Sequence, residues 1–530
     1  MNPAERKNLI VGTGPSAIAA AMAFRRLGIA FEVLDVGFDL EPDRESSVQA
    51  LAAVDPAKWP QDAVSQLFPP PVTSAAGVEK RFTFGSNFPY RRPDYLALTT
   101  EGCVVDVSHG HGGFGNVWGA ATLPYSKHDL EGWPGNSGEL AESYRNVSAF
   151  VPSSVENDGL AETFPIYSKF SPPLARSEQA ESLLRALSSR HKELSSSGIQ
   201  FGRARVAVDT SGGDLTCRYC GACLDGCVYG SIFNPRQLWK KLEQEGVKIH
   251  RGFYALEFQE NADGVTLAAI SLKDGTVHHW DTRRLFIGAG AIGTTRLVAR
   301  SLKLINQPIK IQDSQYFFFP LLAYRAARDT VSRFTLAEVF VEMLNSEISR
   351  NYVHFQVYGL NDIFRQTLRQ MVPVPLRGGS LLGPVEKRFY LFQGFLHSRD
   401  SGHLEMTISA SGPTKDEVHI RGVDNPRSVG VAKRAQSLLR RRLASFGFIP
   451  WLYLKMVPLG RSFHAGGSFP VGNNHPVFTS DPVGRPARLH RVHLLDATTF
   501  PSIPATTITY TAMANADRVI SECHRQGYLE

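Results

Sequence analysis

The chain has 530 residues, of which 43% are hydrophobic, and this length exceeds what one compact core usually serves. Its 57 Lys and Arg residues against 50 Asp and Glu residues give a net charge of +7, which is spread along the chain rather than gathered into a tail. Two or more lobes are therefore expected, and the mild, dispersed basic excess argues against nucleic acid as a partner.

The N-terminal residues move from a charged lead, MNPAERK, straight into an apolar run and a glycine turn. They lack the longer apolar region and the small-residue cleavage site of an export signal. No apolar stretch of the chain reaches the ~18 residues that would span a bilayer. We therefore expect a chain without a transmembrane segment that resides in the cytoplasm.

The stretch NLIVGTGPSAIAAAMAFRRLGIAFEVLD predicts a strand–helix–strand unit. A short buried strand at residues 9–11 leads into a tight turn, a helix follows at 16–27, and a second strand ends at Asp35. The turn carries two glycines in the spacing that binds a dinucleotide. The alternative interpretation is a glycine-rich structural turn.

Individual residues of this unit have distinct expected roles. Gly12 permits the turn, and Gly14 lets the backbone approach a pyrophosphate at the helix N-terminus. Ala17 is small enough for the helix to pack on the strand, and Asp35 lies where a carboxylate can accept the ribose hydroxyls. The unit predicts a dinucleotide site but does not choose between NAD and FAD.

Three later stretches make that choice. HGHGGFGNVWGAATLP (109–124) is a glycine-rich loop with an embedded tryptophan, and RLFIGAGAIGTTRLV (284–298) is a strand, a glycine turn and a helix start. The C-terminal VHLLDATTFPSIPATTITYTAMANADRVI (492–520) gives a strand, a proline-punctuated loop and a closing helix. Together with the first unit, these stretches resemble the glucose–methanol–choline (GMC) family of flavoprotein oxidoreductases.

The resemblance runs from residue 9 to residue 520, with several motifs in the family's order. The matching residues are Gly12, Gly14, Gly112, Gly113, Asn116, Trp118, Gly119, Gly288, Ala289, Gly290, Thr294, Asp496, Thr498, Phe500 and Pro501. The resemblance implies FAD as the cofactor. The candidate FAD-binding residues are Gly12, Gly14, Ala17, Asp35, Gly112, Gly113, Asn116, Trp118, Gly288, Ala289, Gly290, Asp496 and Thr498.

The family likeness also implies the fold class, which is α/β, or α+β overall. A Rossmann-like FAD-binding domain is expected from segments 1–130, 200–305 and 462–530, and a discontinuous substrate domain on an antiparallel sheet from 131–199 and 306–461. The local patterns agree with this division. The segment VKIHRGFYALEFQENADGVTLAAISLKDGTVHHW alternates apolar and polar residues as a strand meander does, and VHFQVYGL and LEMTISA in the substrate segment are strand-like.

A catalytic histidine is implied within RSFHAGGSFPVG. His464, followed by Gly467 and Gly472, matches the family's H-x-x-G-T-x-x-M-G-like sequence. A neutral imidazole can accept the hydroxyl proton of an alcohol while the α-hydride leaves for the flavin. His464 is therefore the predicted base, and the alternative is a structural or surface histidine.

At one position the sequence departs from the family pattern. The family's partner to the histidine is a second His or Asn, and counting back seven residues from Ala512 reaches Ala505 instead. Thr506 or Thr507 can hydrogen-bond a substrate oxygen, although a hydroxyl orients less strongly than the missing side chain. The resemblance makes the glycine-rich loop at 109–124 a flavin-binding segment, here called the flavin loop, and His111 in this loop is a further candidate partner. Substrate and rate stay open at this point, as does loss of catalysis.

These expectations predict an FAD-dependent alcohol dehydrogenase. It would oxidise a hydroxyl of a small-molecule alcohol, such as a sugar or other polyol, to a carbonyl by hydride transfer. Two alternatives remain: a flavin-dependent reductase or isomerase, and a flavin-binding electron-transfer subunit whose catalytic pair has decayed.

Four of the six cysteines fall in CRYCGACLDGCVYG, at the spacing C-x2-C-x2-C-x3-C. Thiolates at these intervals can converge on one iron–sulfur cluster, whereas a zinc site usually divides its ligands between two separated pairs. Cys217, Cys220, Cys223 and Cys227 are therefore candidate ligands of a cluster that would pass electrons from the flavin to an acceptor protein. Zinc and reduced structural thiols are the other two interpretations.

Overall fold

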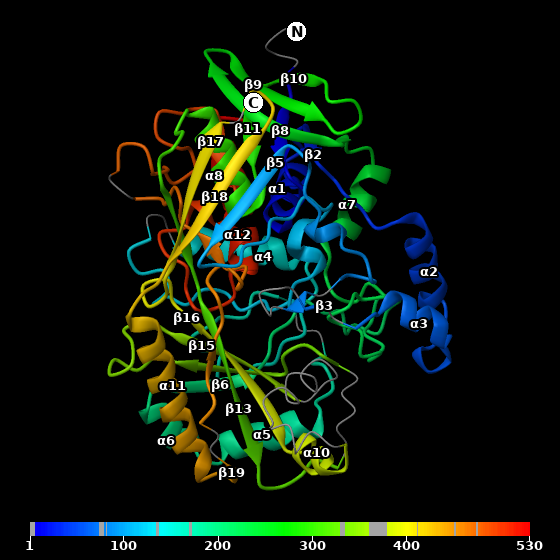
Figure 1. Ribbon diagram of the computed structural model, residues 1–530, viewed down its shortest axis with the longest axis vertical. Coiled ribbons are helices and arrows are strands. Elements are labelled where there is room, and N and C mark those ends of the chain that lie inside the picture. Colours follow the sequence, from blue (N-terminus) through cyan, green and yellow to red (C-terminus); the bar gives the residue numbers. More distant parts are fainter. Residues whose placement is uncertain are drawn as a thin grey trace.

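The computed structural model describes residues 6–529 except for 71, 74–78, 81, 134–136, 169–171, 329–333, 360–378, 411, 450–451 and 473–474. Within these residues, no helix combines the length and the apolar character that crossing a bilayer requires. The helices and strands form two lobes, with a parallel sheet in the upper one and a large antiparallel sheet in the lower one (Figure 1).

A five-stranded parallel sheet with the order β22-β11-β1-β2-β7 forms the centre of the upper lobe. Its strands are β1 (Asn8–Val11), β2 (Phe31–Asp35), β7 (Ile249–Arg251), β11 (Leu285–Ile287) and β22 (Val492–Leu494). The three strands β1, β11 and β22 are buried at every residue, as in parallel sheets that are covered on both faces. The sheet thus joins segments from the beginning, the middle and the end of the chain.

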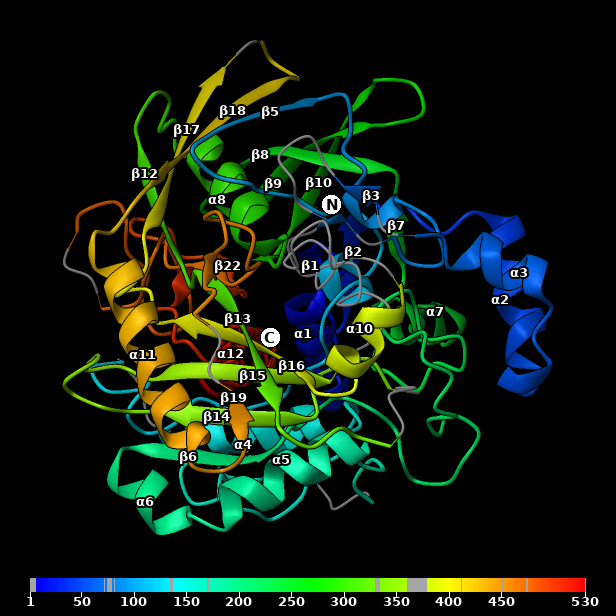
Figure 2. The ribbon, with the colours of Figure 1, turned by 60° about the horizontal axis from the view of Figure 1, so that its bottom comes forward.

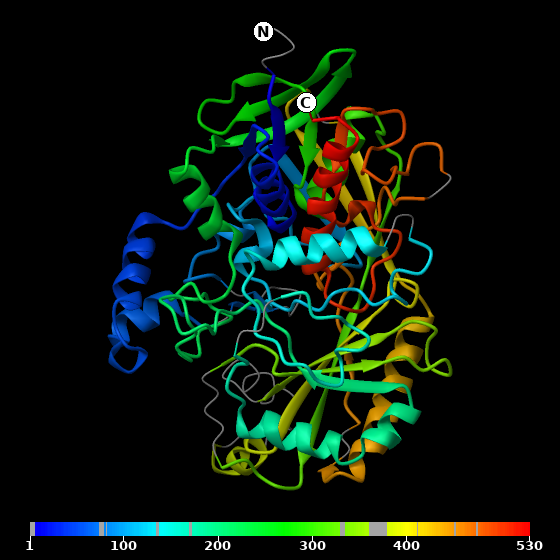
Figure 3. The same ribbon diagram turned by 180° about the vertical axis from the view of Figure 1, so that it is seen from behind.

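Five helices surround this sheet. They are α1 (Pro15–Arg26), α4 (Ser137–Ser148), α7 (Pro235–Gln244), α8 (Gly290–Ser301) and α12 (Ile508–Arg525). The dark-blue α1 and the red α12 pack side by side, and the cyan α4 crosses below them (Figure 3). The close approach of α1 is possible because its buried face is made largely of alanine, including Ala17 and Ala20.

Two antiparallel arrangements extend the upper lobe. A meander with the order β10-β9-β8 consists of β8 (Phe253–Asn261), β9 (Gly264–Ser271) and β10 (Val277–Thr282), where the alternating sequence pattern predicted it. A five-stranded sheet with the order β21-β12-β17-β18-β5 consists of β5 (Leu96–Glu101), β12 (Ile309–Asp313), β17 (His403–Ala410), β18 (Asp416–Val423) and β21 (Ala465–Gly466). In this sheet only β5 and β18 run parallel.

The lower lobe is built on a large antiparallel sheet with the order β19-β13-β16-β15-β14-β6, and β20 pairs with β13. Its strands are β6 (Ile199–Arg203), β13 (Tyr316–Ala323), β14 (Val339–Met343), β15 (Val353–Gly359), β16 (Phe389–Leu396), β19 (Phe448–Ile449) and β20 (Lys455–Met456). Its outer face is covered by α5 (Glu178–Ser188), α6 (His191–Ser196) and α11 (Arg427–Ala444) (Figure 2).

The remaining elements are short or peripheral. They are α2 (Pro42–Ala52), α3 (Gln61–Leu67), α10 (Gly379–Glu386), β3 (Val72–Thr73), β4 (Glu79–Lys80) and the 3-10 helices η2 (Pro56–Lys58), η3 (Phe88–Tyr90), η4 (Gly113–Asn116) and η6 (Ala497–Thr499). The helices α2 and α3 project from one side of the molecule (Figure 1). The segment boundaries expected for the two domains stay a prediction.

Candidate cofactor and substrate site

A cavity of about 230 Å³ extends from the glycine turn after β1 to the start of α12. The predicted FAD-binding residues that line it are Gly12, Gly14, Asp35, Gly113, Gly288, Ala289, Gly290 and Asp496. The predicted residues that lie behind this lining are Ala17, Gly112, Asn116, Trp118 and Thr498. Motifs from distant parts of the sequence therefore meet around one space.

The two glycines of the first turn differ in what surrounds them. Gly12 has a φ of +102°, and a Cβ atom there would lie 2.6 Å from the carbonyl oxygen of Gly288, so a side chain is excluded. A Cβ on Gly14 would meet only that same oxygen, at 4.0 Å. Gly14 precedes α1 and no side chain caps this helix, so its first N–H groups remain available to an anion.

Asp35, at the end of β2, is held by Thr13 of the first glycine turn, which also binds the flavin loop. The Thr13 hydroxyl donates a hydrogen bond of 2.7 Å to Asp35 Oδ2 and accepts one of 3.0 Å from the Gly112 N–H. His111 Nδ1 lies 3.6 Å from the same carboxylate oxygen, and Arg251 donates to His111 Nε2 at 3.0 Å. His111 therefore belongs to the Asp35 end of the site, which leaves the partner role considered for it beside His464 without support.

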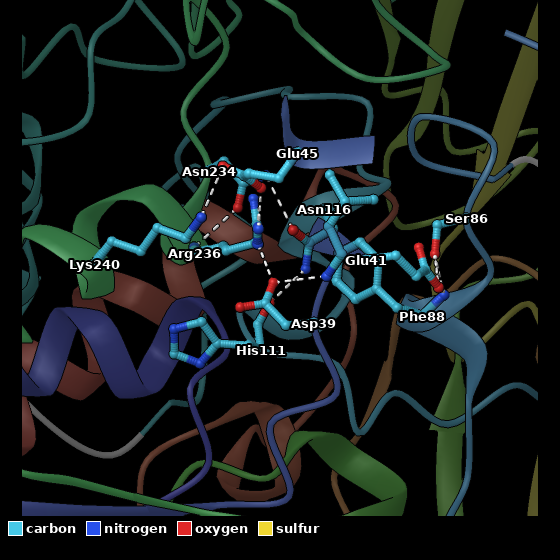
Figure 4. Close-up of polar contacts among 12 residues, drawn as sticks. Asp39, Glu41, Glu45, Ser86, Phe88, His111, Asn116, Asn234, Arg236 and Lys240 are labelled. Carbon is cyan, nitrogen blue, oxygen red and sulfur yellow. Dashed lines mark hydrogen bonds and ion pairs between the residues drawn. The ribbon is translucent and has the colours of Figure 1, made fainter. Parts of the chain in front are cut away.

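Asn116 and Trp118 brace the flavin loop from behind. Asn116 Nδ2 donates hydrogen bonds of 2.8 Å to the carbonyl oxygens of both His111 and Gly113, and its Oδ1 accepts from Asn234 at 3.1 Å (Figure 4). Trp118 Nε1 donates to the carbonyl oxygen of Phe233 at 2.9 Å. These side chains fix the shape of the loop that faces the cavity.

An ion-pair network anchors α7 beside this loop (Figure 4). Arg236 forms ion pairs with Asp39 and Glu45, and Lys240 binds Glu45 at 2.8 Å. Burial works to raise the pKa of Asp39, but the Arg236 guanidinium outweighs it and holds that pKa below its usual value. The network ties the start of α7 to the segment that follows β2.

Asp496 joins the C-terminal strand to the second glycine turn. Its carboxylate accepts hydrogen bonds from the hydroxyls of Thr294, at 2.5 Å, and Thr498, at 2.7 Å. The Thr294 hydroxyl accepts in turn from the Ala289 N–H at 3.1 Å. Burial raises the pKa of Asp496 although these hydroxyls oppose the shift. Thr498 thus does not line the cavity itself but hydrogen-bonds Asp496, which does.

Three cavity residues were missed by the sequence analysis. Arg296 on α8 lies over the ring of Tyr254, 4.4 Å from its centroid, and its Nη1 donates to Asp416 at 3.1 Å. Burial, followed by the charge of Arg296, lowers the pKa of His109 to about 3. Arg296, Tyr254 and His109 line the cavity, and Asp416 does not. Arg296 is a cation in the middle of α8, the helix that follows the second glycine turn. That position is the sequence signal that could have identified it.

His464 lies between the cavity and the large antiparallel sheet. Its neighbours Phe463 and Ala465 line the cavity, while its own ring stacks on Phe395 of β16, with centroids 5.0 Å apart. The buried Nδ1 atom of His464 has no hydrogen-bond partner among the described residues. Burial, together with the nearby His354, lowers the pKa of His464 to about 3, so its imidazole is neutral near pH 7.

The two candidate threonines at the start of α12 differ in their bonding. Thr506 is fully buried, and its hydroxyl has no hydrogen-bond partner within the described parts of the chain. The hydroxyl of Thr507 instead donates a long bond of 3.5 Å to the carbonyl oxygen of Leu123. Of the two, Thr506 is the one whose hydroxyl lacks a partner among the described residues, and it lies behind the residues that line the cavity.

The cysteine loop was predicted as a metal site, and the described residues do not support that prediction. Over the residues described, no three His, Cys, Asp or Glu side chains are arranged to hold a metal ion, and all six cysteines are free thiols. Cys217, Cys223 and Cys227 pack against the main core, whereas Cys220 packs against a separate cluster under α2 and α3. The structure thus gives no support to an iron–sulfur or zinc site, although the four thiols lie near enough to one another to affect each other's pKa.

Burial also affects the protonation of these thiols. It raises the pKa of Cys220 to about 11 and that of Cys223 to about 12, and the neighbouring Cys227 adds to both shifts. Reduced structural thiols are the interpretation that fits this packing.

We expect protein that is made and purified without oxygen to contain neither iron nor acid-labile sulfide in stoichiometric amounts. Colorimetric iron and sulfide assays on freshly purified protein test this expectation. A protein in which Cys217 and Cys223 are both replaced by Ser serves as the control for adventitious metal. Stoichiometric iron that disappears in this double variant would contradict the structural interpretation of the loop.

Comparisons with known proteins find a solved structure that resembles this architecture. No family model matches the chain, and no curated protein matches its sequence. Among solved structures, pyridoxine 4-oxidase from "Mesorbium loti" superimposes with a TM-score of 0.58 at 14% sequence identity, over 98% of this chain and 99% of that one. The chain has the fold of this oxidase. At this identity the likeness concerns the fold, and it confirms the predicted α/β class with one lobe on a parallel sheet and a second lobe on an antiparallel sheet.

Proposed function

We propose that the chain is an FAD-dependent oxidoreductase of the GMC type that acts on the CH–OH group of a small alcohol. The observation that carries the proposal is His464, a neutral imidazole with an unpartnered buried nitrogen that directly adjoins the cavity lining. Two further observations support it: the fold shared with an oxidase and the convergence of four glycine-containing motifs on one cavity.

The residues present fit FAD. The open space at Gly14 and the uncapped start of α1 suit a pyrophosphate, and the Asp35 carboxylate at the end of β2 suits a ribose hydroxyl. Arg296 adds a positive charge to the cavity wall. When bound, FAD supplies the acceptor for a hydride, which the side chains of this protein cannot provide.

The chain's own residues would handle the proton and the orientation of the alcohol. The neutral imidazole of His464 accepts the hydroxyl proton as the C–H bond of the same carbon breaks, which converts CH–OH to a carbonyl. The free hydroxyl of Thr506 is a hydrogen-bonding group for the substrate oxygen. A sugar or other polyol is the substrate that we favour, and an acceptor protein for the electrons stays a proposal.

Anaerobic bleaching of the flavin by a panel of alcohols tests this function. We expect the yellow absorbance of the purified protein to fade on addition of a substrate alcohol and to return on addition of an oxidant. A flavin reductase or isomerase would retain its colour with every alcohol of the panel. A decayed flavin-binding subunit would do so as well, and it would also be insensitive to replacement of His464.

The rate of flavin reduction should be nearly independent of pH between about 8 and 5. The folded-state pKa of His464 is lowered from 6.5 to about 3, so the imidazole stays unprotonated as the pH falls through the usual histidine range. Rapid mixing of enzyme and substrate without oxygen at a series of pH values measures this. A loss of rate that follows a pKa near 6.5 would show that His464 is not buried as described, or that another group is the base.

A further inference from the structure

The large antiparallel sheet has two unlike faces. Successive residues of a strand point to opposite sides, and every second residue of its central strands is apolar and packs under α5 and α11, such as Val341, Phe355 and Phe392. Between them lie both apolar residues, such as Phe340 and Leu391, and a set of polar residues on three adjacent strands. We call this set the polar row: Glu342 of β14, His354, Gln356 and Tyr358 of β15, and Gln393 of β16.

Hydrogen bonds connect the polar row from end to end. His354 Nδ1 and Glu342 Oε1 are 2.5 Å apart, and Gln356 Nε2 lies 3.3 Å from His354 Nε2. The Tyr358 hydroxyl contacts the side-chain oxygens of Gln356, at 2.8 Å, and Gln393, at 3.2 Å. The register sets these pairs, because Glu342 stands opposite His354 and Gln356 stands opposite Gln393.

The polar row is buried except for Gln393, which is half-buried, and such burial is costly for a sheet that needs only an apolar face for stability. Glu342 and His354 are 0% exposed. The second carboxylate oxygen of Glu342 is buried and has no hydrogen-bond partner among the described residues. Burying such a group without a partner costs about 1–3 kcal/mol, so its presence calls for a ligand or an ordered water.

A second carboxylate with one unpartnered oxygen lies near this end of the row, and its other oxygen accepts hydrogen bonds from Ser126. Asp129 Oδ1 is buried and has no partner within the described residues. Burial raises the pKa of Asp129 to about 6, and the charge of Glu342 contributes to the shift. Two carboxyl groups from separate segments thus face the same interior region.

The polar row adjoins the proposed base. Phe395 stands opposite His354 in the register, and its ring contacts both imidazoles, with centroids 5.9 Å from His354 and 5.0 Å from His464. His354 is also close enough to act on the protonation of His464. The row and the base therefore border one region.

We infer that the polar row binds the polar groups of the alcohol other than the hydroxyl that is oxidised, and that Glu342 is a positioning residue that holds His354 for this contact. The inference rests on the proposed function and identifies the face of the site that recognises the substrate. The row alternates carboxylate, imidazole, amide and phenol groups, so it offers both donors and acceptors. A substrate lacking these extra polar groups would leave the row unpaired and would be rejected.

Replacement of Glu342 by Gln tests the inference. Flavin reduction is followed without oxygen, with glucose, sorbitol, glycerol, pyridoxine and benzyl alcohol as the probes. For the best polar probe, we expect the half-saturating concentration to rise about 10- to 100-fold, which is the loss expected for a hydrogen bond to a charged group, while the limiting rate changes far less. Benzyl alcohol, which has no second polar group, should bind more weakly than the best polar probe to the unmodified protein and change little in the variant.

The matched control is Glu338→Gln. Glu338 is also a carboxylate with a pKa raised by burial, but it binds the hydroxyl and N–H of Ser177, at 2.6 and 2.8 Å, at the start of α5. Its replacement tests the effect of losing a buried carboxylate away from the row. If Glu338→Gln raised the half-saturating concentration of the best polar probe as much as Glu342→Gln does, the inference would be overturned.

Tyr358→Phe provides a second variant in case Glu342→Gln does not fold. It keeps the ring and removes only the hydroxyl that contacts the two amides, so a rise in the half-saturating concentration for polar probes is again expected. Unchanged concentrations in this variant would contradict the role of the row. If no alcohol bleaches the flavin of the unmodified protein, the proposed function fails. If alcohols bleach it but the variants of the polar row keep the same half-saturating concentrations, only the inference about the row fails.

Discussion

Replacing His464 with Ala should leave FAD bound but slow its reduction by an alcohol ~100-fold or more, which is the usual scale for loss of a positioned general base. The imidazole stacks on Phe395 and does not line the cavity, so its removal leaves the cavity walls in place. The measurements are the flavin content of the purified variant and its rate of anaerobic reduction. The flavin content reports cofactor binding and the reduction rate reports the chemical step, so the two effects are measured separately.

His475→Ala is the control for this experiment. His475 belongs to the same C-terminal segment, is exposed, and accepts hydrogen bonds from the N–H groups of Val477 and Phe478. Its replacement should leave the rate of flavin reduction within a few-fold of the original, because surface substitutions rarely act on a distant site. Unchanged kinetics in the His464 variant would remove this residue from the mechanism.

Replacing Gly14 with Val should give a folded but colourless protein. A Cβ at Gly14 meets no protein atom closer than 4.0 Å, so the added side chain is tolerated by the fold, but it extends into the space where a pyrophosphate is proposed to bind. The expected result is normal circular dichroism together with a large loss of the flavin absorbance. Release of the cofactor by denaturation and its chromatographic identification measure the FAD content.

Two other glycines calibrate this result. Gly213 is exposed, and a Cβ there would meet only the Ser211 hydroxyl at 3.7 Å, so Gly213→Val should purify as yellow as the original. Gly12→Val should fail to fold, because its Cβ would lie 2.6 Å from the Gly288 oxygen. Full flavin content in the Gly14 variant, or bound NAD in place of flavin, would refute the placement of the pyrophosphate.

Local sequence patterns predicted the first unit of the fold closely. The strand expected at 9–11 corresponds to β1, the helix expected at 16–27 corresponds to α1 at Pro15–Arg26, and the second strand ends at Asp35 in both. These elements depend on interactions between near neighbours, namely the apolar run, the glycine turn and the alanine-rich helix face. Such interactions are visible in a short stretch of sequence.

For the candidate site, the motifs predicted where residues lie along the chain better than they predicted what the side chains contact. Motifs located Asn116 and Trp118 in the flavin loop, but the structure turns both side chains away from the cavity to hydrogen-bond backbone carbonyl oxygens. The cysteine spacing suggested a cluster, but in the part of the chain that the structure describes no three metal-ligating side chains are arranged to hold an ion. A motif gives the place of a residue along the chain, whereas the direction of its side chain depends on what packs around it.

The sequence alone determined the elements that form locally and the glycines that a close approach requires, as at Gly12, because backbone geometry there permits no other residue. Only the tertiary structure decided which residues face His464. Nothing in the strand VHFQVYGL marks His354 as part of a site, since alternation alone does not say which face is covered. The register of β14 and β15 pairs His354 with Glu342, and the stacking of Phe395 brings both to His464, because long-range packing sets these contacts.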